Sequence, residues 1–367
     1  MKSIDLDYVA DTYGIIYNRD LFDSEGWTVP NTTTELFALC DQMQEKAVPF
    51  IAAGDERDKA WSDLFYVWWG QYEGIDNYKN FWDGVNANGV YSRDIFAQEG
   101  RLHALTAMET LVKENYLSTQ SYSFATTAND AAMSFLFGES SSTRKTIAML
   151  PYGESFDKVC GEIKEYYPEM QYPELGIMKV PVISSIIQQC STIENDQMLS
   201  SVIEAIDRGE QSYANVSATD FAIIKNARTI TAHATTMAFS ITKNVKNMIA
   251  AKQFLAFVAS EEGFSVALEN GVKPALNYSV SATQKQYLSK LQNEAMDICK
   301  NAVYLPLETH TILYRIGIFR ELSGVPFGVG ACIGMMRNRN KTAQTIYDDT
   351  LTYYTQQKFE EDLNRII

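Results

Sequence analysis

The side chains that most often carry catalytic chemistry are sparse in this 367-residue chain. Its three histidines, His103, His233 and His310, are far apart and lie outside any HExxH pattern. Zinc sites and nucleophilic triads need histidine beside other ligands or a nucleophile. The sequence therefore predicts neither a histidine-rich metal centre nor a histidine-dependent nucleophile. His103 falls on an amphipathic helix, and the other two are loop residues or ligand contacts.

Carboxylates are abundant, with 46 Asp and Glu residues, and a pair of them could support glycoside hydrolysis. That reaction needs two carboxyl groups at a defined separation across one sugar bond. Sequence spacing does not reveal such a separation, and solvated helix faces explain most of these residues better. The glycines in the run 328–334 have the wrong spacing for a dinucleotide fingerprint. No cofactor is expected.

The overall charge and the aromatic content bound the class of ligand. A net charge of -15 repels phosphate backbones and anionic lipid surfaces. We therefore expect no nucleic-acid partner, and a neutral or cationic ligand. The 21 Tyr, 18 Phe and 5 Trp residues supply flat apolar faces with polar edges, which sugars exploit and which protein cores also use.

The cysteines and the chain ends give few signals. The five cysteines are scattered, without the paired spacing of a zinc or redox site. Free thiols are predicted for Cys40, Cys160, Cys190, Cys299 and Cys332, with a Cys160–Cys190 bridge as the alternative. No run approaches the roughly 20 apolar residues of a spanning helix. The start, MKSIDLD, lacks the apolar stretch and cleavage site of a secretory signal.

Alternating strands and helices must position any binding side chains. The pattern predicts strands over 13–18 and 48–53, with a helix between them that starts near Thr32. The aromatic run WSDLFYVWW, 61–69, ends at Gly70 and predicts a helix over one wall of a cleft. A helix over 98–115 follows, then a strand over 146–150 that Pro151-Tyr152-Gly153 ends abruptly.

The second half of the chain continues the alternation less regularly. Residues 161–230 carry three prolines and one predicted helix, over 197–208. A strand over 239–241 precedes a strongly apolar helix over 248–259 and further helices from 261, over 282–300 and over 341–363. The order predicts an α/β fold with at least partly parallel sheets.

Three stretches occur in an order that resembles a known family. They are YGIIYNRDLFDSEGWTVPNTTTELFALCDQMQEKAVPFIAAG, then DAAMSFLFGES with IAMLPYG, then AFSITKNVKNMIAAKQFLAFVASEEGFSVALENGVKPALN. This order and spacing resemble the bacterial extracellular sugar-binding proteins of ABC importers, the family that includes maltose-binding protein. The resemblance covers nearly the whole chain.

The resemblance implies a two-lobed, periplasmic-binding-protein-like α/β fold with discontinuous lobes. It assigns residues 1–235 to the crossing strand and most of the second lobe, 236–305 to the first lobe, and 306–367 to the second lobe again. Family members normally begin with a section that this sequence lacks, so the first lobe is expected to be incomplete. Residues 236–305 should then expose apolar surface.

The resemblance also implies a function and candidate ligand contacts. It implies a binder rather than an enzyme, a monomer that holds a carbohydrate and delivers it to the permease subunits of an ABC transporter. By the same resemblance it is an extracytoplasmic lipoprotein. Matching positions in the family pattern give the candidate ligand-binding residues Asp11, Tyr13, Asp58, Trp61, Trp69 and Tyr152.

Alternatives remain for the site residues and for the function. Core packing is the alternative for Trp61 and Tyr152, and a surface hinge carboxylate is the alternative for Asp11. For the whole chain, the alternatives are a carbohydrate-active enzyme such as a glycoside hydrolase, or a non-transport sensor or truncated product.

Overall fold

The computed structural model describes residues 4–54, 57–139, 145–242, 244–274, 276, 278–298, 300–306, 313 and 331–365, with side chains except at 4–10, 57–60 and 233–238. The strands are β1 (Ile4–Asn18), β2 (Val48–Phe50), β3 (Ile147–Gly153), β4 (Leu175–Met178), β5 (Ile230–Thr231), β6 (His233–Ile241) and β7 (Val303–Tyr304). The longer helices of the first half are α1 (Arg19–Glu25), α2 (Thr33–Met43), α3 (Arg57–Glu73), α4 (Ile75–Asp83), α5 (Glu99–Lys113), α6 (Ala128–Phe137) and α7 (Phe156–Tyr166). Those of the second half are α8 (Asp196–Asp207), α9 (Ala218–Thr229), α10 (Met248–Val258), α11 (Glu261–Glu269), α12 (Lys290–Ile298), α15 (Ile333–Asn338), α16 (Ala343–Tyr353) and α17 (Gln356–Leu363).

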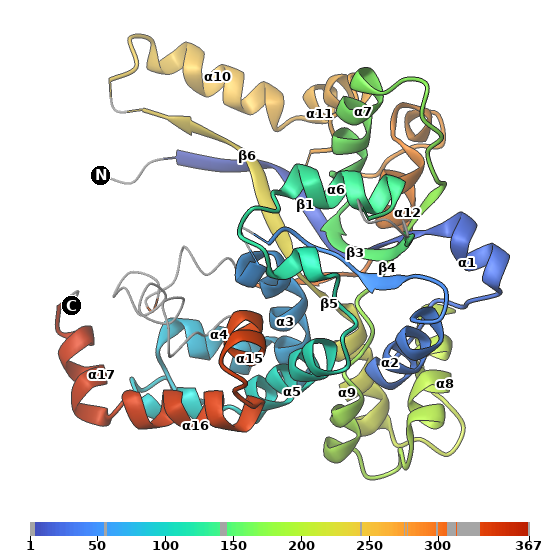
Figure 1. Ribbon diagram of the computed structural model, residues 1–367. Helices are drawn as coiled ribbons and strands as arrows, with labels where there is room; N and C mark the ends of the chain where they lie inside the picture. Colours follow the sequence, from blue (N-terminus) through green and yellow to red (C-terminus); the bar gives the residue numbers. More distant parts are fainter. Residues whose placement is uncertain are drawn as a thin grey trace.

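The long strand β1 organises the sheet. Its first part pairs with β6 in antiparallel register, from Ile4 opposite Ile241 to Thr12 opposite His233. Its second part pairs with β3 on one side and β4 on the other, both antiparallel, while β2 joins β3 in parallel. Strand β1 therefore connects its pairing with β6 to the group formed by β2, β3 and β4 (Figure 1). The prediction of an at least partly parallel sheet is confirmed by the β2–β3 pair, although β1 pairs only in antiparallel register.

Local capping explains where several helices begin. The Asn18 side chain accepts a hydrogen bond from the Leu21 amide at the start of α1, and Thr32 accepts one from the Glu35 amide at the start of α2. Thr127 and Asp130 form a reciprocal capping box at α6. Such side chains satisfy amide groups that have no partner inside the helix. The predicted helix start near Thr32 is confirmed.

An aromatic core lies between α3, α4, α5 and the C-terminal helices. Trp69 lies at its centre, with ring centroids 4.6 Å from Phe81 and 5.2 Å from Tyr78. The Trp69 indole nitrogen donates to Gln98 Oε1 at 2.8 Å. Phe96 stacks on Tyr354, with centroids 4.3 Å apart. Segments more than 250 residues apart in sequence therefore share this core.

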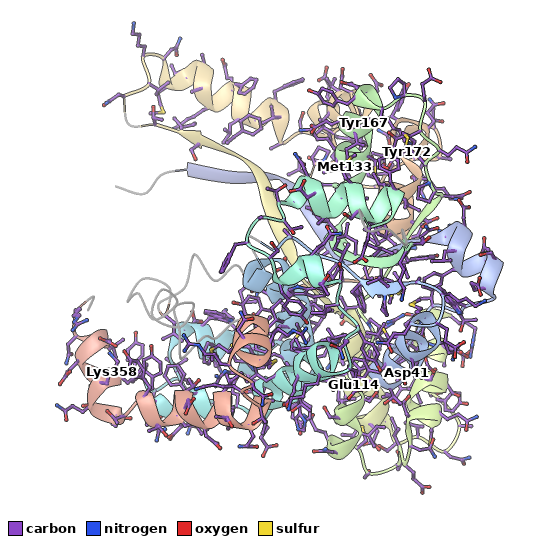
Figure 2. All side chains as sticks on the ribbon, viewed as in Figure 1. Asp41, Glu114, Met133, Tyr167, Tyr172 and Lys358 are labelled. Atoms are coloured by element: carbon purple, nitrogen blue, oxygen red, sulfur yellow. The ribbon has the colours of Figure 1, made fainter. Side chains whose placement is uncertain are left out.

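A second, smaller core lies on the other face of the β1–β3 pairing. It contains Ile16, Phe135 from α6 and Phe156 from α7, each with at most 1% exposed surface. Met133 and Tyr172 pack against its edge, and Figure 2 shows both near α6 and α7. The two cores hold β1 and β3 rigidly between them.

Two sequence-based boundaries were wrong, and several helices were not predicted. Strand β3 does not stop at Leu150 but continues through Pro151 to Gly153, because these residues pair with Ile15 to Tyr13 of β1. Helix α3 passes through Gly70 to Glu73. A β-carbon at Gly70 would lie 2.7 Å from Leu305 Cδ2, so this glycine admits a neighbouring segment rather than ending the helix. Helices α4, α6, α7 and α9 were not predicted.

Helix α10 lies over β6, away from most of the other helices (Figure 1). Val258 is its one buried residue, whereas Ile249 is 72% exposed and Phe254 is 54% exposed. The predicted apolar helix is confirmed, as is the expectation that this part of the chain exposes apolar surface. Its stability therefore depends on few tertiary contacts.

Candidate functional site

A cavity of about 240 Å³ opens where β1 and β3 meet α3, α6 and α7. Helix α3 contributes Asp63, α6 contributes Ala128 and neighbouring small residues, and α7 contributes Phe156. The full lining is Asp11, Tyr13, Ala52, Ala53, Asp63, Ala128, Asn129, Ala131, Ala132, Leu150, Pro151, Tyr152, Gly153, Phe156 and Val159. The lining joins a mostly apolar wall to a few polar groups, as small-molecule sites do.

Asp11 is held in a fitted cradle at the edge of this cavity. Its Oδ1 accepts from the Ser155 amide at 2.8 Å, and its Oδ2 accepts from the Ser155 hydroxyl at 2.5 Å. A β-carbon on Gly153 would lie 2.2 Å from the carboxyl atoms of Asp11, so the carboxyl group needs a glycine there. Burial raises the pKa of Asp11, and the hydrogen bonds from Ser155 oppose that rise. Each carboxylate oxygen keeps acceptor capacity for a ligand hydroxyl.

Tyr13 projects from the same face of β1 as Asp11, because alternate residues of a strand share a face. It is 7% exposed, and its hydroxyl is buried at the cavity, near the backbone of Leu64. Burial, with the charge of Asp63, raises the pKa of Tyr13 well above its usual value. The phenol therefore stays protonated and can donate a hydrogen bond.

Tyr152 supplies an aromatic surface on the β3 side. It is partly exposed, and its ring packs edge-on against Phe156, with centroids 5.3 Å apart and planes at 63°. Phe156 itself is fully buried, so its contact restrains the orientation of the Tyr152 ring. The cavity therefore contains both a partly open aromatic face, from Tyr152, and hydrogen-bond acceptors, from Asp11.

Glu154, which lies between Gly153 and Ser155, forms a buried ion pair next to residues that line the cavity or bind Asp11. Glu154 is 3% exposed, and its carboxylate pairs with the Lys273 ammonium. Burial raises the pKa of Glu154 to about 7, although the charge of Lys273 opposes this rise. The pair therefore lies in a strongly desolvated position.

The structure brings three of the six predicted site residues together: Asp11, Tyr13 and Tyr152 all line the cavity. Trp61 and Trp69 do not line it. Both are fully buried in the aromatic core, where Trp61 packs against Phe50 at 5.9 Å. For these two tryptophans the structure shows core packing, because α3 is enclosed by other elements on the side that carries them.

The remaining comparisons between sequence and site concern α3 and α6. Asp58 belongs to α3, but its side chain lies outside the described residues. Two cavity-lining residues were not among the candidates predicted from sequence: Asp63 on α3 and Asn129 near the start of α6. Neither residue stood out in the sequence, because Asp63 follows Ser62 and Asn129 precedes Asp130, as polar residues at solvated positions often do.

The described residues contain no group of three His, Cys, Asp or Glu side chains that could hold a metal ion. Cys40, Cys160, Cys190 and Cys332 carry free thiols. Among the described helices, none combines the length and apolar character that crossing a membrane requires. His310, Cys299 and the glycines at 328 and 330 lie outside the described residues.

Several solved structures share the fold. A chitin oligosaccharide binding protein aligns with a TM-score of 0.59 at 16% identity, covering 98% of this chain and 72% of that one. The bacterial solute receptor AcbH gives 0.59 at 16% identity, with 98% and 71% coverage. RafE from Streptococcus pneumoniae, without ligand, gives 0.55 at 14% identity, with 95% and 70% coverage. At these identities the likeness shows the fold, which is the two-lobed α/β fold of solute-binding proteins.

Sequence comparison gives the family. No curated protein sequence matches the chain significantly. The family model described as "Bacterial extracellular solute-binding protein" matches residues 2–263, more than half of the chain. Members of this family bind solutes and are not enzymes, so the glycoside hydrolase alternative is set aside. The chain belongs to the bacterial extracellular solute-binding protein family.

Proposed function

We propose that this protein binds a neutral carbohydrate in the cavity between β1, β3 and α6. The observation that carries this proposal is that the Asp11 carboxylate and the partly open Tyr152 ring both line one cavity. Sugars present hydroxyl donors around their edge and apolar C–H groups on their faces. A cavity that contains both an acceptor and an aromatic ring matches both features.

The charges of the cavity favour a ligand without an anionic group. Two carboxylates, Asp11 and Asp63, line the cavity, and no Lys or Arg appears among the described lining residues. A uronic acid or a sugar phosphate would bring a negative charge next to them without a compensating cation. Charge repulsion at short range in a partly desolvated site disfavours such a ligand.

The solved structures of similar fold support a carbohydrate as the class of ligand. Their descriptions name chitin oligosaccharide, raffinose, stachyose and β-D-galactopyranose. These are ligands of those proteins. All four are neutral sugars, which is the class of ligand that the cavity of this protein favours. The cavity volume alone does not distinguish one sugar unit from an oligosaccharide, so both belong in the test.

The transport role follows from the same proposal. The protein, a monomer anchored outside the cytoplasm as a lipoprotein, delivers its sugar to the permease subunits of an ABC transporter. Residues 1–235 and 306–367 form most of the second lobe, and 236–305 belong to the first. Closure of the lobes around the sugar then signals occupancy to the transporter.

Isothermal titration calorimetry with raffinose, stachyose, galactose, chitotriose and xylotriose tests the proposal, with glucuronic acid and an amino acid mixture as contrasts. We expect binding of at least one neutral sugar. Tyr152→Ala should weaken it about tenfold, through loss of roughly 1.4 kcal/mol of contact with the ring. Tyr166→Ala is the matched control, because Tyr166 is 80% exposed and outside the cavity. Binding of amino acids alone would refute the carbohydrate assignment.

A further inference from the structure

Two backbone segments exchange contacts at the edge of the cavity. The Glu154 amide donates to the Thr12 carbonyl at 3.2 Å, and the Ser155 amide donates to the Asp11 carboxylate at 2.8 Å. The C-terminal end of β3 is therefore hydrogen-bonded to β1 through two consecutive amides, those of Glu154 and Ser155. Any movement of residue 154 moves Ser155, and with it the hydrogen bonds that orient Asp11.

A third segment reaches the same place from beyond α11. Lys273 follows the turn at the end of α11, and its ammonium pairs with the Glu154 carboxylate. Both side chains are well buried, with 15% of Lys273 and 4% of Glu154 exposed. Glu154 Oε2 has no hydrogen-bond partner among the described residues, so Lys273 is the compensation for this buried charge.

A buried carboxylate with one cationic partner depends strongly on that partner. Removing one member of such a pair leaves an uncompensated charge, which must then move towards water or take up a proton. A carboxylate that turns towards water draws residue 154 away from Thr12, and one that takes up a proton loses the ionic contact that ties it to Lys273. The charge of Lys273 also acts on Asp11 directly, where it lowers the pKa that burial raises.

We propose that Lys273 is a positioning residue for the cavity: through its ion pair with Glu154 it fixes the Ser155–Asp11 contact and couples the segment after α11 to the ligand site. The proposal rests on the cavity being the ligand site. Lys273 does not itself line the cavity. Its role is to hold the residues that do.

The coupling has a consequence for how binding is communicated. The segment that carries Lys273 includes α10 and α11, which contact each other and, through β6, the first part of β1. A ligand that tightens Asp11 in its cradle also favours the Glu154–Lys273 pair, and so favours the docked position of this segment. Linkage requires the reverse as well: fixing the segment raises ligand affinity.

Hydrogen exchange on the whole chain tests the positioning role without any sugar. We expect Lys273→Met to raise the exchange rate of the Ser155 amide about tenfold or more, because its acceptor is no longer held in place. Lys273→Arg should restore protection, since the guanidinium keeps the positive charge. Lys252→Met is the matched control, because Lys252 is an exposed lysine on α10 and far from the pair in sequence. An unchanged Ser155 exchange rate in Lys273→Met overturns the proposal.

A double variant and a binding measurement complete the test. If Lys273→Met does not fold, the double variant Glu154→Gln, Lys273→Met removes both charges, and the same faster exchange at Ser155 is expected. With raffinose, stachyose, galactose, chitotriose or xylotriose as probe, whichever binds the native protein, Lys273→Met should raise Kd about tenfold while Lys252→Met leaves it unchanged. If none of these sugars binds but Ser155 responds, the proposed function fails and the positioning role stands. If sugar binds equally well to both variants, the coupling is refuted.

Discussion

Replacing Gly153 by alanine tests the cradle of Asp11 most directly. The added β-carbon would lie 2.2 Å from Cγ, Oδ1 and Oδ2 of Asp11. Ordinary carbon contacts begin near about 3.5 Å, so the carboxyl group must move by more than an ångström. The backbone of Gly153 is not in the left-handed region, so the substitution adds no backbone strain of its own to this steric clash.

The magnitude follows from the contacts that this movement breaks. Asp11 accepts two hydrogen bonds from Ser155, at 2.8 and 2.5 Å. Hydrogen bonds to a charged group contribute about 1.5–3 kcal/mol each. Replacing glycine by alanine returns up to about 1 kcal/mol through the unfolded chain. We therefore expect Gly153→Ala to lower the free energy of unfolding by about 2–5 kcal/mol, and to weaken sugar binding.

Urea denaturation measures the change, and two further variants interpret it. Gly161→Ala is the matched control: it lies within α7, and an added β-carbon there would meet nothing within 4 Å, so a gain of about 0.5–1 kcal/mol is expected. Asp11→Ala removes the carboxyl group that the new methyl would strike. The double variant Asp11→Ala, Gly153→Ala should then cost little more than Asp11→Ala alone. Native stability in Gly153→Ala, or strictly additive losses in the double variant, would refute the cradle.

Three other outcomes can be measured. Trp69→Ala should lower the free energy of unfolding by about 3–5 kcal/mol in urea denaturation, because it empties a packed aromatic core; unchanged stability would contradict that placement. Burial raises the pKa of Glu154 from 4.5 to about 7, so the folded protein binds this proton more tightly than the unfolded chain does. Stability should therefore fall as pH rises through this interval, and Glu154→Gln should flatten the curve. In hydrogen exchange, α10 should exchange fast, and the strands at Ile15 and Ile147, both fully buried, should exchange slowly; equal protection would argue against the sparse packing of α10.

The sequence alone determined much of the local structure. The helix start at Thr32 and the apolar stripe of α5 follow from capping residues and from helical periodicity. These signals are local, because a cap or a stripe involves residues within one or two turns. The family also followed from sequence, since the order of several elements is a property of the chain and not of its contacts.

Boundaries and exposure could not be predicted in the same way. Pro151 to Gly153 would be expected to end a strand, but pairing with β1 extends β3 through them. Gly70 would be expected to end a helix, but it makes room for Leu305, more than 230 residues away. In both cases a partner distant in sequence outweighed a local preference.

The site shows the same division most clearly. Trp69 and Tyr152 were both candidates in sequence, as large aromatic residues near glycines. Packing against Tyr78 and Phe81 buries Trp69, whereas Tyr152 keeps a partly open face at the cavity. Whether an aromatic ring meets a ligand or the core depends on which elements cover it. The hydrogen bonds between Asp11 and Ser155, 144 residues apart, likewise exist only because β1 and β3 are neighbours in the folded sheet.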